Sequence, residues 1–126
     1  MEIISVSMDR EQLGQLDKIQ QKLGFKSRSK LLRATIDSMM NEYDVLDSRR
    51  GHTDAVFTVT HSSVGTDSLS RLLTEFEDVI MTEIHQHHKS LCLRVLIACG
   101  DAKRIKELFS HLKRRKGIRS VQVSVL

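Results

Sequence analysis

The hydrophobic and polar positions of the first 43 residues change from a period of two to a helical spacing. Residues 3–8 (IISVSM) alternate, which predicts a short strand. Asp9, followed by a glutamine three positions later, is typical of a helix start, and Gly24 is typical of a helix end. A second amphipathic helix is expected over residues 27–43. The chain therefore begins with the pattern strand, helix, helix.

Residues 44–54 show neither a period of two nor a helical spacing. After them, segments of the two kinds alternate along the chain. The expected elements are strand 55–61, helix 66–81, strand 82–88, strand 91–99, a helix that opens at Gly100-Asp101, and strand 118–126. This β-α-β-β-α-β order is the ferredoxin-like pattern. We predict an α+β protein with domains at 1–46 and 55–126 and a linker at 47–54.

Composition narrows the class of protein. With 40% hydrophobic and 29% charged residues in 126, the chain is typical of a globular protein. The start of the chain lacks the pattern of a signal peptide, and no apolar run reaches the length of a membrane helix. Two cysteines do not form a disulfide framework. We expect a cytoplasmic protein. The run Lys113-Arg114-Arg115-Lys116 is typical of a solvated helix end, and nucleic-acid contact is the alternative.

The strand-helix-helix unit is too small to bury a core by itself. A lone strand also leaves its backbone groups unpaired. Pairing with a second copy solves both problems, since two strands then form an antiparallel ribbon above a shared core. The outer face of that ribbon would show Ile3, Ser5 and Ser7 from each subunit. Such a ribbon fits the major groove of double-stranded DNA, where serine can reach base edges and isoleucine a thymine methyl.

The start of the second predicted helix adds a candidate phosphate site. Its first N–H groups, at Ser27, Arg28 and Ser29, carry the positive end of the helix dipole. Lys26 adds positive charge beside them. The alternative is that Ser27 is an ordinary helix cap and that the basic residues are solvated. Because these features occur together and in this order, we predict DNA binding.

Histidines and a cysteine cluster in the second half of the chain. His85 and His87 would point to the same side of a strand, and Cys92 follows on the next strand. Imidazole and thiolate ligands suit nickel, copper or zinc, so we predict a transition-metal site, with His88 or His61 as a fourth ligand. The alternative is a polar strand edge beside a buried cysteine. Sequence motifs of catalysis are absent, and Cys92 has no orienting acid nearby, so no enzyme activity is expected.

The residues Gly24-Phe25-Lys26-Ser27-Arg28-Ser29, between the two predicted helices, resemble the signature of ribbon-helix-helix repressors. The overall layout, with His85-x-His87, Cys92-Leu93 and Lys116-Gly117-Ile118, resembles the nickel-responsive regulators (NikR). The resemblance implies a transcription repressor with a C-terminal ACT-like domain. It also implies a homodimer through the N-terminal strand, a homotetramer through the ACT-like domain, and an operator with two half-sites.

The resemblance also implies a square-planar nickel site with one histidine from a neighbouring subunit; copper, zinc and cobalt are the other candidate metals. The ligands from one subunit align with His85, His87 and Cys92. Thr74 stands near the position of the neighbour's histidine, and Arg94 stands where the family has glutamate. Two alternatives remain: a metal-independent regulator whose ACT-like domain only oligomerises or senses a small molecule, and an antitoxin-type DNA-binding protein.

Overall fold

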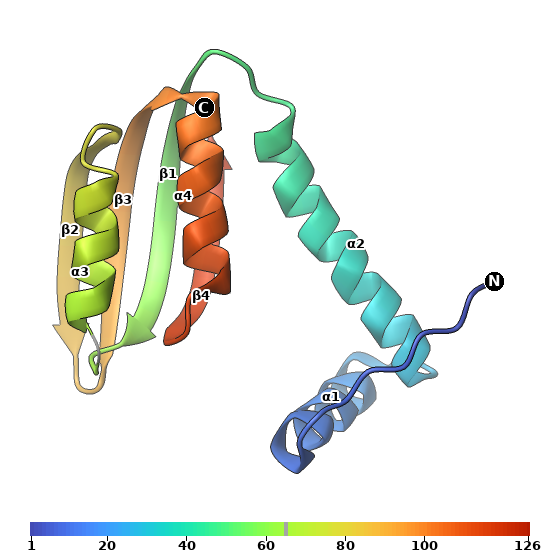
Figure 1. Cartoon of the computed structure of the whole chain (residues 1–126). Helices are drawn as coiled ribbons and strands as arrows, with labels where there is room; N and C mark the ends of the chain where they lie inside the picture. Colours follow the sequence, from blue (N-terminus) through green and yellow to red (C-terminus); the bar gives the residue numbers. More distant parts are fainter. Residues whose placement is uncertain (65) are drawn as a thin grey trace. The chain divides into compact units, whose positions relative to one another are not determined.

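The structure, a computed structural model, describes residues 1–64 and 66–126 (Figure 1). Contacts divide the chain into two compact units, Met1–Asn41 and Glu42–Leu126. The helix α2 (Arg28–Asp47) contributes residues to both units.

The first unit contains α1 (Arg10–Leu23) and most of α2. The predicted N-caps of both helices and the predicted C-cap of α1 are confirmed. The Asp9 carboxylate accepts a hydrogen bond from the Gln12 N–H at 2.7 Å, and the Ser27 hydroxyl accepts one from the Lys30 N–H at 3.1 Å. Gly24 adopts a left-handed conformation with φ of 74°, which ends α1.

The predicted strand at residues 3–8 is not formed in the single chain. The described segment 1–9 forms neither helix nor strand, and Ile3 is 95% exposed. Every residue of α1 is at least partly exposed. A strand needs a neighbour for its backbone hydrogen bonds, so one copy cannot form the ribbon. The ribbon therefore stays a prediction about the assembled protein.

The second unit is an antiparallel four-stranded sheet in the order β2-β3-β1-β4, with two helices over one face (Figure 1). Its elements are β1 (His52–Ser62), α3 (Thr66–Glu75), β2 (Ile80–His88), β3 (Leu91–Asp101), α4 (Ala102–Arg114) and β4 (Ile118–Val125). The predicted β-α-β-β-α-β order is confirmed.

Several boundaries differ from the prediction, and β1 begins at His52, within the predicted linker 47–54. The helix expected to reach residue 81 ends at Glu75, and β2 begins at Ile80. Phe76 and Val79 fill the turn between them and are buried, so their apolar spacing extends the helical pattern beyond the helix. The second helix runs to Asp47 instead of ending near residue 43, because Leu46 is 1% exposed and belongs to the core.

The core lies between the sheet and the two helices. Along β1, buried and half-buried residues alternate, so that every second side chain faces α3 and α4. Phe57, Leu96 and Ile105 are fully buried at the centre. Within the described residues, none of the helices is long and apolar enough to cross a membrane.

Candidate metal centre

The sheet register aligns the predicted metal ligands. His87 on β2 is paired with Cys92 on β3, and Cys92 is paired with His61 on β1. In the next row, His85 is paired with Arg94. Since side chains alternate along a strand, all five lie on the face that the helices cover. The same-side placement that we predicted for His85 and His87 follows directly from this register.

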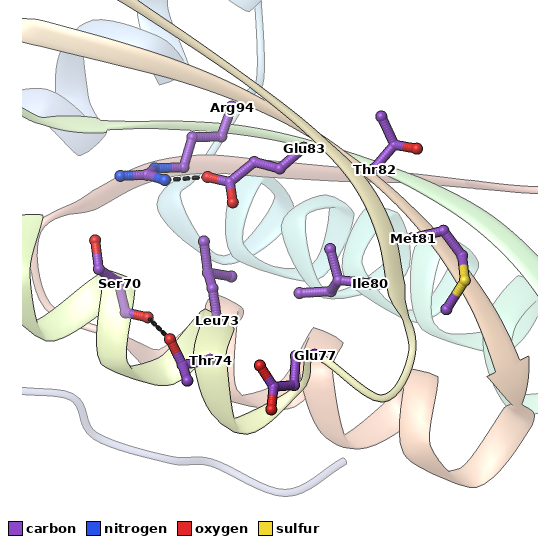
Figure 2. Close-up of a pocket in the computed structure, with 9 residues that line it drawn as sticks. All are labelled: Ser70, Leu73, Thr74, Glu77, Ile80, Met81, Thr82, Glu83 and Arg94. Carbon is purple, nitrogen blue, oxygen red and sulfur yellow. Dashed lines mark hydrogen bonds and ion pairs between the residues drawn. The ribbon is translucent and has the colours of Figure 1, made fainter.

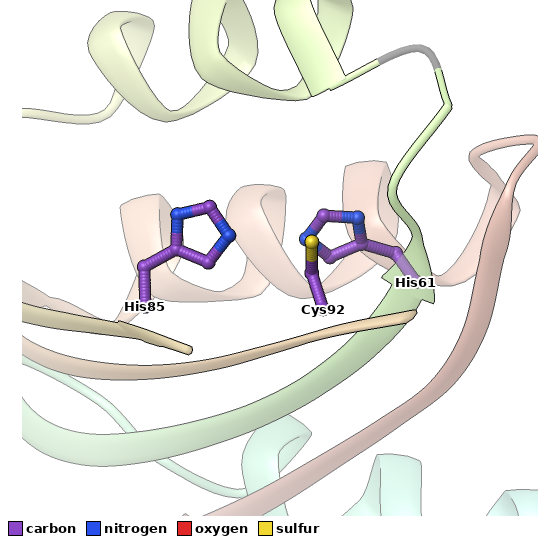
Figure 3. A group of neighbouring side chains, drawn as sticks. All are labelled: His61, His85 and Cys92. Atoms are coloured by element: carbon purple, nitrogen blue, oxygen red, sulfur yellow. The ribbon is translucent and has the colours of Figure 1, made fainter. Parts of the chain in front are cut away.

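Three of these side chains approach one another closely (Figure 3). One potential ligand atom from each of His61, His85 and Cys92 lies within 4.8 Å of the others. The Cys92 Sγ also lies 3.1 Å from the His87 Nδ1. His61 and Cys92 are 3% and 2% exposed, whereas His85 and His87 are exposed on the edge strand. The cluster is thus closed on the inner side and open at the sheet edge.

This donor set fits a transition metal. Zinc and similar ions take nitrogen and sulfur ligands at about 2.0–2.3 Å, so the donors around one ion are separated by roughly 3–4.5 Å. The spacing within 4.8 Å therefore needs only small shifts to close around an ion. His61, His85, His87 and Cys92 would hold it. A mixture of imidazole and thiolate suits nickel, copper or zinc better than calcium or magnesium.

His61 is tied to its surroundings through both ring nitrogens. Its Nδ1 lies 2.7 Å from the Ser62 carbonyl oxygen, and its Nε2 lies 3.0 Å from the Arg94 Nε. Arginine can only donate hydrogen bonds, so the Nε2 atom must accept and the Nδ1–H must donate. His61 is therefore a neutral imidazole whose remaining lone pair is directed at Arg94.

Arg94 is itself buried, with 5% of its surface exposed. Its second partner is Glu83 on β2, with which it forms an ion pair. A buried charge is costly unless it is paired, and this carboxylate supplies the counter-charge. The positively charged Arg94 side chain therefore lies next to the metal-ligand candidates, on their buried side.

The environment of His85 disfavours its protonated form. Loss of solvent lowers the pKa of the His85 imidazole, and the positive charge of Arg94 lowers this pKa further. A neutral imidazole has a lone pair for a metal, and a depressed pKa keeps that lone pair unprotonated as the solution becomes more acidic. His85 is thus suited to act as a ligand at neutral pH.

A cavity of about 380 Å³ adjoins the cluster, between α3 and β2 (Figure 2). Glu83 and Arg94 lie on its sheet side, and Glu77 and Thr74 lie on its helix side. Thr74 donates to the Ser70 carbonyl at 2.9 Å. Thr74, the position where the resemblance implies a histidine directed at a neighbouring subunit, is exposed and lines this cavity.

Of the two candidates for a fourth ligand, the structure brings His61 into the cluster and not His88. His88 is paired with Leu91, one position along from His87, so it points to the opposite face of the sheet. The sequence shows no helical or strand signal that would favour His61 over His88. Only the pairing of β1 with β3 reveals that His61 lies opposite Cys92.

The predicted DNA-contacting residues lie in the first unit. Ile3, Ser5 and Ser7 are exposed in the segment before α1, and Lys26, Ser27 and Ser29 surround the start of α2. Arg28 is paired with Asp17, with its Nε 2.8 Å from Oδ1. A hollow of about 860 Å³ runs between the N-terminal segment and the two helices, lined by apolar side chains that include Ile4, Leu13 and Ile36.

Comparison with solved structures supports the fold of the second unit. A protein of Thermotoga maritima described as uncharacterized matches with a TM-score of 0.56 and 18% identity over 60% of this chain and 98% of its own. The ACT domain of a GTP pyrophosphokinase from Chlorobium tepidum matches with a TM-score of 0.52 and 13% identity, over 58% of this chain and 99% of its own. The second unit is therefore an ACT-like domain.

Comparison with protein families and curated sequences extends to the whole chain. The family profile described as the NikR C-terminal nickel-binding domain matches residues 56–126. A Methanococcus aeolicus protein named "Putative nickel-responsive regulator" is 30% identical over all of this chain and 92% of its own length. A Methanosarcina mazei protein of the same name, numbered 3, is 28% identical over 98% of this chain and 91% of its own. The chain therefore belongs to the NikR family.

Proposed function

We propose that this protein is a DNA-binding transcriptional repressor whose ACT-like unit binds a transition metal, with nickel as the first candidate. The observation that carries the proposal is the row His87–Cys92–His61 across three strands, with His85 beside it. The names of the relatives support nickel as the signal. Copper, zinc and cobalt are tested as alternatives.

Each ligand would act as a deprotonated donor. Cys92 would bind as thiolate and the histidines as neutral imidazoles, so metal binding releases protons and weakens in acid. The Ser62 carbonyl, which accepts from the His61 Nδ1–H, fixes this ring so that Nε2 faces the cluster. A bound metal would supply a multivalent positive charge that joins β1, β2 and β3 at one point.

The exposed apolar surface of the first unit supports a dimer. Ile4 and Val6 are 80% and 61% exposed, and the hollow beside them is lined by apolar side chains. A second copy of the unit would cover these side chains and pair the two N-terminal segments as a ribbon. That ribbon would present Ser5 and Ser7 to DNA bases, and the start of α2 would bind phosphate. Tetramer formation through the ACT-like units would then give two separated half-sites.

Two measurements test this proposal. Equilibrium dialysis against Ni(II), Cu(II), Zn(II) and Co(II) gives the metal content per chain of the wild type and of Cys92→Ser. The matched control is Cys99→Ser, because Cys99 lies on the same strand but on the opposite face. Selection from random DNA duplexes, with Ni(II) or with a chelator, then identifies the bound sequence and its dependence on metal.

We expect about one metal ion per chain for the wild type and for Cys99→Ser, a strong loss for Cys92→Ser, and tighter DNA binding with metal. Equal metal binding by all three proteins would show that Cys92 is not a ligand and would refute the proposed metal site. Selection of the same DNA with and without metal would instead support a metal-independent regulator. Failure to enrich any duplex under either condition would refute DNA binding.

A further inference from the structure

We propose that Arg94 is a built-in competitor of the metal: its guanidinium occupies the lone pair of His61 that would otherwise coordinate the ion. This inference rests on the proposed metal function and defines how the site is tuned. The observation behind it is a buried cation within the donor cluster, with its Nε 3.0 Å from the His61 Nε2.

The competition follows from the valence of the imidazole. The Nδ1–H of His61 donates to the Ser62 carbonyl, so Nε2 is the ring nitrogen with a lone pair for coordination. The same lone pair accepts the hydrogen bond from Arg94. It cannot serve both partners at once. His61 becomes a ligand only when the Arg94 guanidinium moves away.

Charge opposes the metal as well. The guanidinium of arginine carries a positive charge in proteins. A fixed positive charge a few ångströms from a divalent ion is repulsive, and the repulsion is strong in a buried site because water screens it poorly. Glu83 offsets part of this charge through its ion pair with Arg94. The site therefore binds metal more weakly than the same donors would without Arg94.

The cavity between α3 and β2 gives the displaced side chain a place. Arg94 and Glu83 already line this cavity, and Glu77 lines it from the turn that follows α3 (Figure 2). A guanidinium that leaves His61 can therefore keep its pair with Glu83 and approach a second carboxylate. Metal binding would be coupled in this way to a change at the α3–β2 edge, where Thr74 is exposed.

The test compares metal affinity among charge variants of the full-length chain. Arg94→Gln removes the charge, and Arg94→Lys retains it. A double variant, Glu83→Gln with Arg94→Gln, avoids leaving an unpaired carboxylate and so guards against loss of folding. Arg119→Gln removes one positive charge from an exposed position on β4 and is the matched control. Circular dichroism confirms that each variant is folded.

Ni(II) dissociation constants are measured by competition with a chelator, and the thiolate-to-metal absorption band is followed separately. We expect Arg94→Gln and the double variant to bind Ni(II) about tenfold or more tightly than the wild type. Arg94→Lys and Arg119→Gln should stay close to the wild type. Adding His61→Ala to Arg94→Gln should remove most of the gain, because His61 is the donor that Arg94 masks, and loss of the positive charge accounts for the remainder.

The outcomes separate this inference from the proposed function. Equal affinity in the wild type, Arg94→Gln and the double variant would overturn the competition and leave the metal function intact. A gain that survives His61→Ala undiminished would overturn the role of His61. Binding by the Arg94→Gln variants alone would support the inference and refute a metal response in the natural chain. If no variant binds any metal, both the inference and the metal function fail.

Discussion

Arg28 and Asp17 form a two-point ion pair between α2 and α1, with Nε 2.8 Å from Oδ1 and the second guanidinium nitrogen 3.0 Å from Oδ2. The hydrogen bond from Arg28 lowers the pKa of the Asp17 carboxyl, and the same bond raises the pKa of Arg28. Both side chains are about half exposed, at 55% and 48%. The arginine proposed to meet a DNA phosphate is therefore already held by a carboxylate.

This pair predicts opposite effects of two substitutions on DNA affinity. Arg28→Ala should weaken binding to specific and random duplexes alike and reduce the salt slope by about one, since one phosphate contact is lost. Asp17→Asn should strengthen binding by roughly two- to fivefold, because the guanidinium no longer has a competing carboxylate. Fluorescence anisotropy at several salt concentrations measures both.

Asp37→Asn is the control for net charge, because Asp37 is another exposed carboxylate in the first unit. An equal gain from Asp37→Asn and Asp17→Asn would show that general repulsion, and not the pair with Arg28, limits DNA binding.

Leu46→Ala should destabilise the ACT-like unit by about 2–5 kcal/mol, the usual cost of a cavity left by a buried leucine. Leu46 is 1% exposed, and the end of α2 is also held by Lys106, whose Nζ lies 3.0 Å from the Asp47 carbonyl oxygen. Urea unfolding followed by circular dichroism gives the change. Val45→Ala, at the neighbouring exposed position, should cost far less. Similar losses for both would mean that the last turn of α2 does not pack in the core.

Gly100→Ala should destabilise the same unit by about 1–3 kcal/mol through overpacking. A Cβ atom at position 100 would lie 2.6 Å from the Val79 Cγ1, and Val79 is buried with few alternative rotamers. Gly14→Ala is a useful contrast, because a Cβ there meets nothing within 4 Å inside a helix. That change should stabilise α1 by about 0.5–1 kcal/mol. Thermal unfolding of both variants checks the opposite signs.

Asp78→Asn should lower the melting temperature at neutral pH and have no effect in strong acid. Arg104 donates to the Asp78 carboxylate at 2.9 and 3.0 Å, and this hydrogen bonding lowers the pKa of Asp78 below the usual value of an aspartate. A carboxyl with a depressed pKa in the folded state stabilises the fold above its unfolded pKa, and the contribution is lost as the pH falls through the folded value. Melting curves at about pH 7 and about pH 2 test this.

Glu75→Gln removes a nearby negative charge on α3, where Arg104 contacts only the Glu75 backbone carbonyl. It should change the melting temperature less than Asp78→Asn does. A difference between Asp78→Asn and the wild type that persists unchanged in acid would show that the carboxylate is not responsible.

The sequence alone predicted the element order of the second unit because its strands and helices have distinct apolar periods. The end of α3 was misplaced because Phe76 and Val79 belong to a buried turn that continues the helical spacing. The ribbon at residues 3–8 needs a second chain, so a single copy leaves that prediction open.

The sequence could predict which side chains of the candidate site share one side of a strand, but not which strands lie next to each other. Alternation places His85 and His87 on one side, and it also places Arg94 on the same side as Cys92. It cannot show that His61, 33 residues before Arg94 in the chain, accepts a hydrogen bond from it. That contact depends on β1 lying beside β3 in the sheet, which the order of elements along the chain does not specify.

The hairpin between β2 and β3 brings some of the metal-ligand candidates together through a short stretch of chain, whereas His61 on β1 is far from them in the sequence. Lys89, in a left-handed conformation with φ of 55°, closes a turn that brings His87 and Cys92 together across only five positions. Closing so short a loop is fast and costs little entropy. His61 reaches the same cluster only after β1 has paired with β3. If β1 detaches from β3 by local unfolding, the hairpin keeps its donors and His61 is lost, so the strength of metal binding would report whether β1 is in place.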